Sequence, residues 1–386
     1  MKDLIFLTEE FPYPATTGGK VAAATLLAGL TSSYRVHLFC LIAQGAKIPD
    51  TLELGLTSLT VRHSRLDTHR HPIHTGGRIL NSWRAGLPFT IRKAWDSELK
   101  RRVDEKIAHL DHPVILAERL QTVQYVREYP YYLIEHNVEY SLAHGRAALA
   151  PTSVERTLWK VEGWLLKSYE RSALMGAKAI LALSPEDRTH LVREFHIDPH
   201  RIEQAYLPVT QRWGEKTEVG RYIAVIGSAV WYENATGLRW FLNTVFPSLP
   251  ADIPLLIAGK SVKKVVEGNN SPALKVIEEF NSVADLVNDI RVLVVPVQNA
   301  SGIRMKILQA LDAGVPVVTT TAGAKGLPDP FGIGLRVEDF PNHMAKALAS
   351  VYYDEGQRAA MIQKGRNFVS TLSLNVFSDR LRAWLG

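Results

Sequence analysis

One segment, residues 294–320, constrains the fold more than any other part of the chain; its sequence is VVPVQNASGIRMKILQALDAGVPVVTT. Valine-rich runs lie at both ends, and an amphipathic stretch that stops at Gly314 lies between them. The pattern predicts a strand, a turn of small residues, a helix over 303–313 and a second strand. Strands that alternate with helices in this way build a parallel sheet wrapped by helices.

The turn of small residues suits an anion. Gly302 lets the backbone approach a ligand closely because it has no side chain. The start of the following helix offers unpaired N–H groups and the positive end of the helix dipole. Arg304 and Lys306 lie in the first turn of the predicted helix, where their charge opposes that dipole. A bound anion would remove the conflict, so we predict a phosphate-binding corner here.

Apolar and amphipathic segments alternate along the whole chain, whose 386 residues are too many for one ordinary core. In the first half the predicted strands are 4–7, 36–41, 114–117, 131–135 and 179–183, and the predicted helices are 19–30, 97–110, 153–175 and 185–195. In the second half the strands are 222–226, 255–258, 292–295 and 315–319, and the helices are 237–245, 303–313 and the C-terminal segment 357–386. We therefore predict an α/β protein of two Rossmann-like domains, with ligand in a cleft that faces the carboxyl ends of their strands.

Composition favours a protein of a reducing compartment. Cys40 is the only cysteine, which excludes an internal disulfide. No segment approaches the roughly 18 uninterrupted apolar residues of a membrane helix, and the short apolar start of the chain suits a first strand rather than a signal peptide. We expect a cytoplasmic protein.

In the first half, polar residues follow the ends of predicted strands, where α/β sheets bind their ligands. Glu118 follows the strand 114–117, and Glu135, His136 and Asn137 lie where the strand 131–135 ends. A lone histidine is more often structural, but this position makes His136 a candidate functional residue.

Glycines and other small residues supply further candidates. Gly18 and Gly19 precede the first helix, where they either admit a phosphate or acceptor or simply serve the helix start; they do not match the dinucleotide fingerprint GxGxxG. Gly227 and Ser228 follow a predicted strand and suit a phosphate or ribose, although the same turn is also explained by Asn234 as a helix N-cap. The segment 276–286 is predicted to be a strand and a short turn leading into a helix, of the kind that encloses a nucleobase.

A basic stretch lies between residues 62 and 102. It contains ten Lys and Arg residues (62, 65, 70, 78, 84, 92, 93, 100, 101 and 102) against three acidic ones (67, 96 and 98). It is either a solvated face or a docking surface for anionic lipid or a phosphorylated acceptor. Nucleic acid is not expected, because no nucleic-acid-binding motif accompanies the charge.

Other chemistries lack support. The chain has no GxSxG elbow, HExxH helix or Walker A loop. His63, His69, His71 and His74 lie within the basic stretch, but their spacings fit no metal site and no cysteine accompanies them. We expect no metal.

Taken together, these pieces resemble the retaining glycosyltransferases of family four, the glycosyl transferases group 1. The resemblance spans nearly the whole chain and is most specific over residues 301–327, where the pattern is SGIRMKILQA, then GVPVV, then Gly323 and Gly326-Leu327. The other matching motifs are FPYP with GG (11–19), GLP with Arg (86–92), EHN with Glu (135–139), ALS with Asp (182–187), GS with Trp and Asn (227–234) and Gly259.

The resemblance implies a GT-B fold and a transfer reaction. The N-terminal, acceptor-side domain would cover 1–205 and be joined by a C-terminal helix at about 367–386, and the nucleotide-sugar-binding domain would cover 206–366. The chain would move a hexose from a nucleotide-sugar, expected to be a UDP-sugar, to a saccharide or lipid-linked acceptor, retaining the anomeric configuration without metal or cofactor. Surface polysaccharide biosynthesis is the implied setting, with the protein cytoplasmic or peripheral to the inner face of the membrane, docked on anionic lipid through residues 62–102.

The resemblance also assigns roles to residues. The catalytic residues would be His136, Arg304 and Lys306, and Glu118, Glu135 and Asn137 would lie on the acceptor or sugar side. The donor would be bound by Gly18, Gly19, Gly227, Ser228, Trp231, Asn234, Gly259, Val283, Ser301, Gly302, Ile303 and Gln309.

Two departures from the family pattern leave alternatives open. Many members carry two glutamates separated by seven residues, and the matching positions here hold Ser301 and Gln309. An arginine–lysine pair after the first strand of the second domain is also missing, and we infer that Arg304 and Lys306 supply the charge instead. The alternatives are a GT-B binding partner that has lost catalysis and a nucleotide-sugar epimerase.

Overall fold

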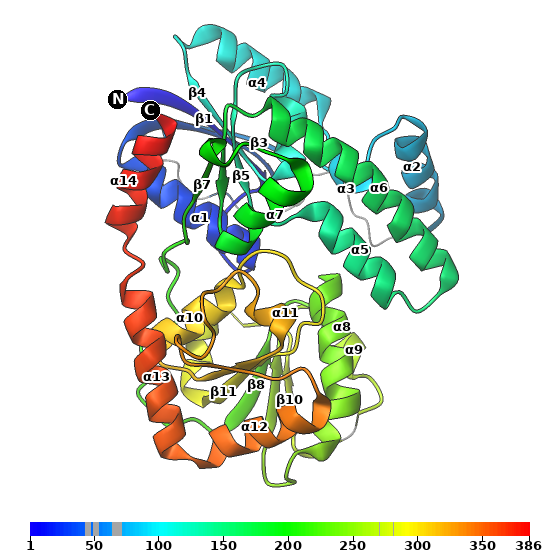
Figure 1. The fold of residues 1–386 in the computed structure, drawn as a ribbon, viewed down its shortest axis with the longest axis vertical. Coiled ribbons are helices and arrows are strands. Elements are labelled where there is room, and N and C mark those ends of the chain that lie inside the picture. Colours follow the sequence, from blue (N-terminus) through cyan, green and yellow to red (C-terminus); the bar gives the residue numbers. More distant parts are fainter. Residues whose placement is uncertain (43–47, 49–53, 64–71, 270, 281) are drawn as a thin grey trace. The chain divides into compact units, whose positions relative to one another are not determined.

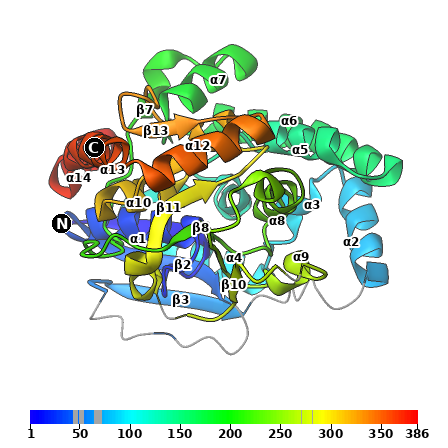
Figure 2. The ribbon, with the colours of Figure 1, turned by 90° about the horizontal axis from the view of Figure 1, so that it is seen from below.

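The computed structural model describes residues 1–42, 48, 54–63, 72–269, 271–280 and 282–386, except for the side chains of residues 72–75. These residues form two compact units. The N-terminal unit contains Met1–Pro14, Ala22–Leu207 and Asn375–Gly386, and the C-terminal unit contains Ala15–Val21 and Pro208–Leu374. Helices flank a parallel sheet in each unit (Figures 1 and 2).

The sheet of the N-terminal unit has seven strands among the described residues, in the order β3-β2-β1-β4-β5-β6-β7. Their bounds are β1 Lys2–Glu10, β2 Tyr34–Ile42, β3 Ser58–His63, β4 Val114–Glu118, β5 Tyr132–Glu135, β6 Ala179–Ala182 and β7 Ile202–Gln204. Every pairing is parallel. The interior strand β1 is buried over Leu4–Leu7, as its unbroken apolar run predicts.

The helices of this unit connect the strands. They are α1 Gly18–Thr31, α2 Pro72–Arg84, α3 Phe89–Arg92, α4 Ser97–His109, α5 Glu139–Leu149, α6 Ser153–Gly176, α7 Pro185–Phe195 and α14 Leu374–Leu385. Local signals fix several starts: the Ser184 hydroxyl accepts a hydrogen bond from the Asp187 amide at 3.0 Å, and Pro185 occupies the first position of α7.

The sheet of the C-terminal unit has six parallel strands among the described residues, in the order β10-β9-β8-β11-β12-β13. The strands are β8 Tyr222–Ile226, β9 Leu255–Ala258, β10 Leu274–Ile277, β11 Ile290–Val295, β12 Val317–Thr319 and β13 Leu335–Val337. The helices are α8 Tyr232–Trp240, α9 Lys263–Val266, α10 Met305–Ala313, α11 Thr321–Ala324, α12 Pro341–Tyr353 and α13 Glu355–Ser370. The predicted α/β class with two Rossmann-like sheets is confirmed.

Two predicted elements of this unit are wrong in detail. The helix predicted over 237–245 begins at Tyr232 and continues as a π-helical turn over Phe241–Val245. The segment 276–286 does not lead into a helix; β10 is followed by the 3-10 turns Val283–Asp285 and Val287–Asp289.

The C-terminal segment forms two helices rather than the single one predicted. α13 belongs to the C-terminal unit and α14 to the N-terminal unit, and the chain between them is not helical. α14 packs on α1, where a Cβ on Gly29 would lie 3.2 Å from Leu381 Cδ1. The Lys2 ammonium donates to the Gly386 carbonyl, so the two termini lie side by side (Figure 1).

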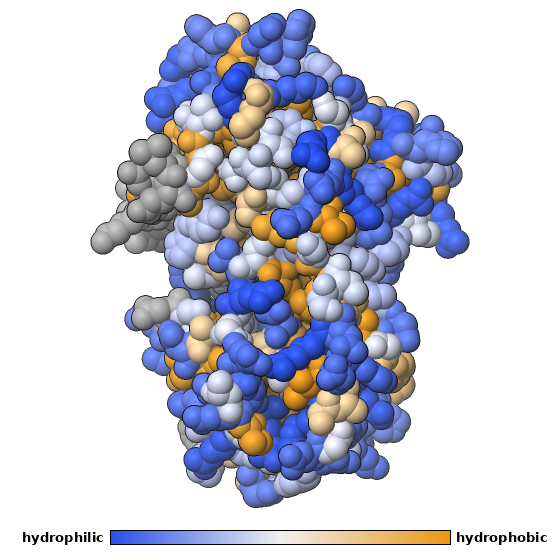
Figure 3. Space-filling view, turned by 90° about the vertical axis from the view of Figure 1, so that its left-hand side faces the viewer, coloured by the Kyte–Doolittle hydropathy of each residue, from blue (hydrophilic) through white to orange (hydrophobic). Residues whose placement is uncertain are grey.

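No described helix has the length and apolar character needed to cross a bilayer. On the face drawn in Figure 3, hydrophilic residues predominate and the hydrophobic ones lie in small, separate groups.

The packing of α14 predicts how much it stabilises the N-terminal unit. Leu381 is 1% exposed, so Leu381→Ala should lower the free energy of unfolding by about 2–5 kcal/mol through lost burial and the cavity left behind. Val376→Ala is the matched control on the same helix, because Val376 is 59% exposed. Urea unfolding measures both variants; equal losses would show that α14 is not packed as described.

Candidate functional site

The predicted anion corner follows β11 in the C-terminal unit. Ser301 is buried, and Gly302 has φ +68°, a conformation that favours glycine. α10 begins at Met305, two residues later than predicted, with Arg304 in the N-cap position. The Arg304 guanidinium turns back to donate to the carbonyls of Ser301 and Gly302, the second at 3.4 Å. Arg304 therefore holds the loop in place.

Lys306 is the second residue of α10, two positions after Arg304. Its ammonium donates to the Ile226 carbonyl at 2.8 Å and lies 3.4 Å from Asn234 Oδ1. Removal from water lowers the pKa of Lys306 to about 8, and the nearby charge of Arg304 adds to the shift. Within the described part of the chain no carboxylate forms an ion pair with Lys306. A cation in this setting favours an anionic ligand.

Two glycines bring the backbone close to this ammonium. Gly227, at the end of β8, has φ +153°, and a Cβ there would lie 2.5 Å from Lys306 Nζ. Gly259, at the end of β9, has φ +152°, and its Cβ would meet the Gly227 carbonyl oxygen. Both positions therefore require glycine, and both lie at carboxyl ends of neighbouring parallel strands.

Asn234 does not cap α8, so that interpretation is wrong. The N-cap position is held by Trp231, which is 40% exposed, and Asn234 lies within the first turn. The Asn234 amide donates to the Ser228 carbonyl at 2.9 Å while its oxygen faces Lys306. This side chain joins the turn after β8 to the corner before α10.

The remaining donor-site candidates of this unit lie as follows. Gln309 is buried on α10, and its amide donates to the Gln211 carbonyl at 2.6 Å. Val283 is half-buried in its 3-10 turn, and Ile303 is half-buried in the loop before α10. Contacts thus bring Gly227, Asn234 and Lys306 together, whereas Gln309 is bonded to the segment between β7 and β8.

In the N-terminal unit, the ends of β4 and β5 bring two candidates together. His136 Nε2 lies 3.0 Å from Glu118 Oε1, and both side chains are buried. Burial lowers the pKa of His136, while the negative charge of Glu118 opposes that shift. β4 and β5 are neighbours in the sheet, which explains why residues 18 positions apart in the chain meet.

Glu135 has a different setting. It is buried, and burial together with the charge of Glu170 raises its pKa well above the ordinary value. Glu170, on α6, accepts hydrogen bonds from the Glu139 and Tyr140 amides at 2.9 and 3.1 Å. Burial raises the pKa of Glu170 to about 8. The raised pKa values of both carboxyls favour their neutral, protonated forms.

Arg119 is a functional candidate that the sequence did not suggest. It has φ +71°, rare for a residue with a side chain, and such strain is common at functional sites. Its guanidinium lies 3.3 Å from Oε2 of Glu9, near the end of β1. Only its position directly after Glu118 could have drawn attention to it.

The other candidates near the first helix and β5 are less constrained. α1 begins at Gly18, and a Cβ on Gly18 would meet nothing within 4 Å, so packing does not require glycine there. Gly19 and Asn137 are half-buried. The close approach of a ligand to Gly18 and Gly19 stays a prediction.

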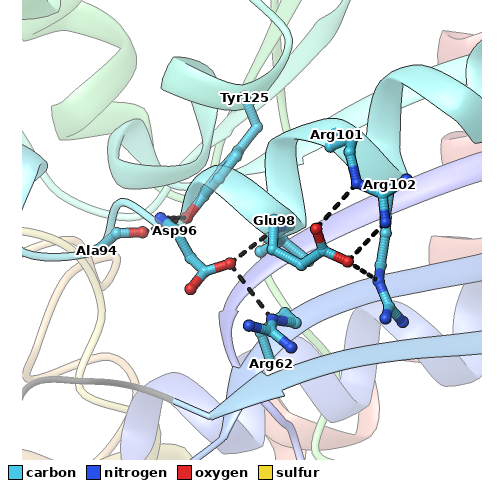
Figure 4. A network of polar contacts seen from close by, with 8 residues as sticks. Arg62, Ala94, Asp96, Glu98, Arg101, Arg102 and Tyr125 are labelled. Atoms are coloured by element: carbon cyan, nitrogen blue, oxygen red, sulfur yellow. Dashed lines mark hydrogen bonds and ion pairs between the residues drawn. The ribbon is translucent and has the colours of Figure 1, made fainter.

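Several cations of the basic stretch, along α4 and at Arg62, are paired with nearby carboxylates. Along α4 the cations are paired: Glu98 accepts from Arg101 and Arg102 at 2.7 and 2.9 Å (Figure 4). Lys100 lies 2.7 Å from Asp104. Arg62 lies 3.4 Å from Asp96. This part is a self-paired, solvated face. Arg65, His69, Arg70, His71 and the side chain of His74 lie outside the described residues.

The described residues hold no group of three or more His, Cys, Asp and Glu side chains arranged for a metal ion.

The buried carboxyls predict a pH dependence of stability. Because the folded-state pKa of Glu135 and Glu170 lies above the unfolded value of 4.5, the native protein keeps protons that the unfolded chain releases. The free energy of unfolding should therefore fall as pH rises from about 4.5 to about 8.

Glu135→Gln removes one of these titrating carboxyls, so the free energy of unfolding of the variant should fall less steeply with pH. Between pH 5.5 and 8.5 its stability relative to the wild type should rise by on the order of 1 kcal/mol. Urea unfolding at both pH values measures the gain. Parallel profiles for wild type and variant would show that Glu135 ionises normally.

Comparisons with known proteins agree with this architecture. Residues 220–354 match the family model of glycosyl transferases group 1. No curated protein matches the sequence significantly.

Solved structures match over the whole chain. WaaG, a glycosyltransferase involved in lipopolysaccharide biosynthesis, has a TM-score of 0.66 and 14% identity, with 98% of each chain covered. Sucrose-phosphate synthase from Thermosynechococcus elongatus has a TM-score of 0.72 and 13% identity, covering 100% of this chain and 99% of that one. Anabaena Alr3699/HepE, solved with UDP and glucose, has a TM-score of 0.67 and 13% identity, with the same coverage. At these identities the likeness shows the GT-B fold.

Proposed function

We propose, from the match of residues 220–354 to the family model of group 1 glycosyltransferases, that the chain transfers a hexose from a UDP-sugar to an acceptor hydroxyl with retention of the anomeric configuration. The single observation that carries this proposal is the ammonium of Lys306, held between the Ile226 carbonyl and Asn234 beside Gly227. A diphosphate at this point would meet a cation that has no carboxylate partner among the described residues, beside the backbone of Gly227.

The chemistry of the step follows from where charge develops. As the bond from the sugar to the diphosphate breaks, negative charge grows on the leaving phosphate oxygens. We propose that Lys306 and the backbone N–H groups after Ser301 stabilise that charge, a task that a divalent cation performs in other enzymes. Arg304 contributes positive charge while its side chain holds the loop. We propose that the reaction needs neither metal nor cofactor.

The N-terminal unit would contribute His136. Its lowered pKa favours a neutral imidazole at pH 7, and Glu118 at 3.0 Å fixes the orientation of the ring. We propose that His136 contacts the donor sugar. Burial and the charge of Glu170 raise the pKa of Glu135, which disfavours its charged form, so we propose that Glu135 contacts the acceptor or sugar as a neutral carboxyl.

The donor and the setting follow by analogy with the structural relatives. Anabaena Alr3699/HepE was solved with UDP-glucose, which favours a UDP-sugar donor. WaaG is involved in lipopolysaccharide biosynthesis, which favours a saccharide or lipid-linked acceptor in surface polysaccharide assembly. A cytoplasmic protein that docks on an anionic membrane surface would reach such an acceptor.

The first test removes the cation. Lys306→Ala should lower turnover at least a hundredfold, because losing one such charge costs about 2.7–4 kcal/mol of transition-state stabilisation. Lys346→Ala, which removes an exposed lysine of α12, is the matched control. Turnover is measured as UDP release that depends on acceptor. A Lys306→Ala enzyme with near-normal turnover would refute the assignment.

The second test uses pH. Because the protonated form of Lys306 binds the diphosphate and its pKa in the free protein is about 8, UDP affinity should fall as pH rises from 7 to 9.5. UDP stays fully ionised over this range, since phosphate monoesters lose their second proton near pH 6. Calorimetric titration measures the slope, and Lys306→Ala should abolish it. A slope that survives in Lys306→Ala would have to come from another group.

The same assays separate the alternatives. A thermal-shift screen of UDP-, GDP-, ADP- and dTDP-sugars identifies the donor, because a ligand at a hundred times its dissociation constant adds about 2.7 kcal/mol of stability. A donor that binds but is neither transferred nor hydrolysed with a broad acceptor panel indicates a non-catalytic binding protein. Conversion of the donor without any acceptor indicates an epimerase.

A further inference from the structure

A second pocket lies wholly within the N-terminal unit, at the carboxyl ends of β2 and β3. Its volume is about 440 Å³, a size that accommodates a sugar phosphate. α2, α3 and the segment before α4 form its other walls. The lining residues are Leu41, His63, Arg78, Asn81, Ser82, Ala85, Leu87, Arg92, Lys93, Trp95 and Asp96.

The charge of this lining is positive. Arg78 and Arg92 are exposed, and within the described part of the chain neither forms an ion pair with a carboxylate. Lys93 reaches Glu9 only at 4.0 Å. The single lining carboxylate, Asp96, is already satisfied, because it accepts from the Leu99 amide at 2.8 Å and lies 3.4 Å from Arg62 (Figure 4). Three cations therefore share a concave surface, which concentrates anions.

The pocket also has an aromatic wall. The Trp95 ring stacks on Tyr125 at 5.3 Å with an interplanar angle of 9°. The Arg92 guanidinium lies 5.1 Å from the Trp95 ring centroid, which limits its motion. An exposed arginine held in this way is partly preorganised to donate two parallel hydrogen bonds to one phosphate group.

A buried carboxylate anchors the wall formed by α2 and α3. Glu162, on α6, accepts from the Trp83 indole at 2.7 Å and from the Phe89 and Thr90 amides at 3.1 and 2.8 Å. The Ser82 hydroxyl donates to the Leu87 carbonyl at 2.9 Å and closes the loop between the two helices. Arg78 and Arg92 are thus carried by elements that are fixed to the body of the unit.

We propose that this pocket binds a phosphate group carried by the acceptor, through Arg78, Arg92 and Lys93. The inference rests on the proposed function, since it assigns to that reaction a phosphorylated acceptor. It also narrows the basic stretch to one site: the cations of α4 pair with their own acids, whereas the pocket cations remain available for a ligand.

The test measures the fluorine NMR resonance of Trp95, which lines the pocket. The protein is labelled with 5-fluorotryptophan, and Trp95→Phe assigns the Trp95 resonance. Glucose 6-phosphate is added stepwise in the presence of saturating UDP, so that the predicted anion corner before α10 is already occupied. Arg78→Glu should weaken glucose 6-phosphate binding at least tenfold. Arg84→Glu, the same charge change on the same helix but outside the pocket lining, should change it less than twofold.

A parallel arm distinguishes the source of the phosphate. Binding to phosphatidylglycerol vesicles that is weakened by Arg78→Glu, spared by Arg84→Glu and competed by inorganic phosphate supports the pocket with a lipid-borne phosphate. Equal losses in the two variants show general attraction to net charge and overturn the proposal, as does the absence of any Trp95 shift or vesicle binding. UDP-induced thermal stabilisation is measured on the wild type and on every variant. If UDP does not stabilise the wild type, the proposed donor site is wrong, whereas the Trp95 titration still tests the second pocket by itself.

Discussion

The contact between the Lys306 ammonium and the Ile226 carbonyl organises the C-terminal unit. It links α10 to the end of β8, across 80 positions of the chain, at 2.8 Å. Its neighbours are a carbonyl and an amide oxygen rather than a carboxylate, so the charge is oriented but not neutralised. The features that depress the pKa of Lys306, removal from water and the charge of Arg304, are the same features that would favour a bound anion. A bound anion relieves both.

The close packing around that contact leaves little space for side chains at Gly227 and Gly259. Gly227 cannot carry a side chain because Lys306 occupies the place of its Cβ, and Gly259 cannot carry one because the backbone of Gly227 does. Asn234 completes the arrangement by holding the Ser228 carbonyl. Under the proposed function, a cation supplied by α10 would replace the one that the family pattern places in the turn after β8, which here consists of glycine and serine.

The sequence predicted this corner because its signals are local. A valine-rich strand, a small-residue turn and Gly314, with φ +76° at the end of α10, are all visible within one segment. Signals that depend on distant partners were missed. Glu170 meets Glu135 only because α6 packs beside β5, and the strained backbone of Arg119 leaves no mark in its residue type. The short edge strands β3 and β7 mix polar with apolar residues and lack the apolar runs that identified the interior strands. α10 starts later than its pattern predicts because the Arg304 guanidinium bonds back to the loop carbonyls.

The basic stretch shows why a charge count is a poor guide to function. The sequence gives the same formal weight to Arg101 on α4 and to Arg78 on α2. In the structure, Arg101 lies 2.7 Å from Glu98, and exposed pairs of this kind contribute little beyond local order. Arg78 lines a pocket in which Asp96 is the one carboxylate among the described lining residues, and Asp96 is held by Arg62 and the start of α4. What distinguishes a binding surface from a solvated one is therefore whether the acids nearby are already committed to other partners.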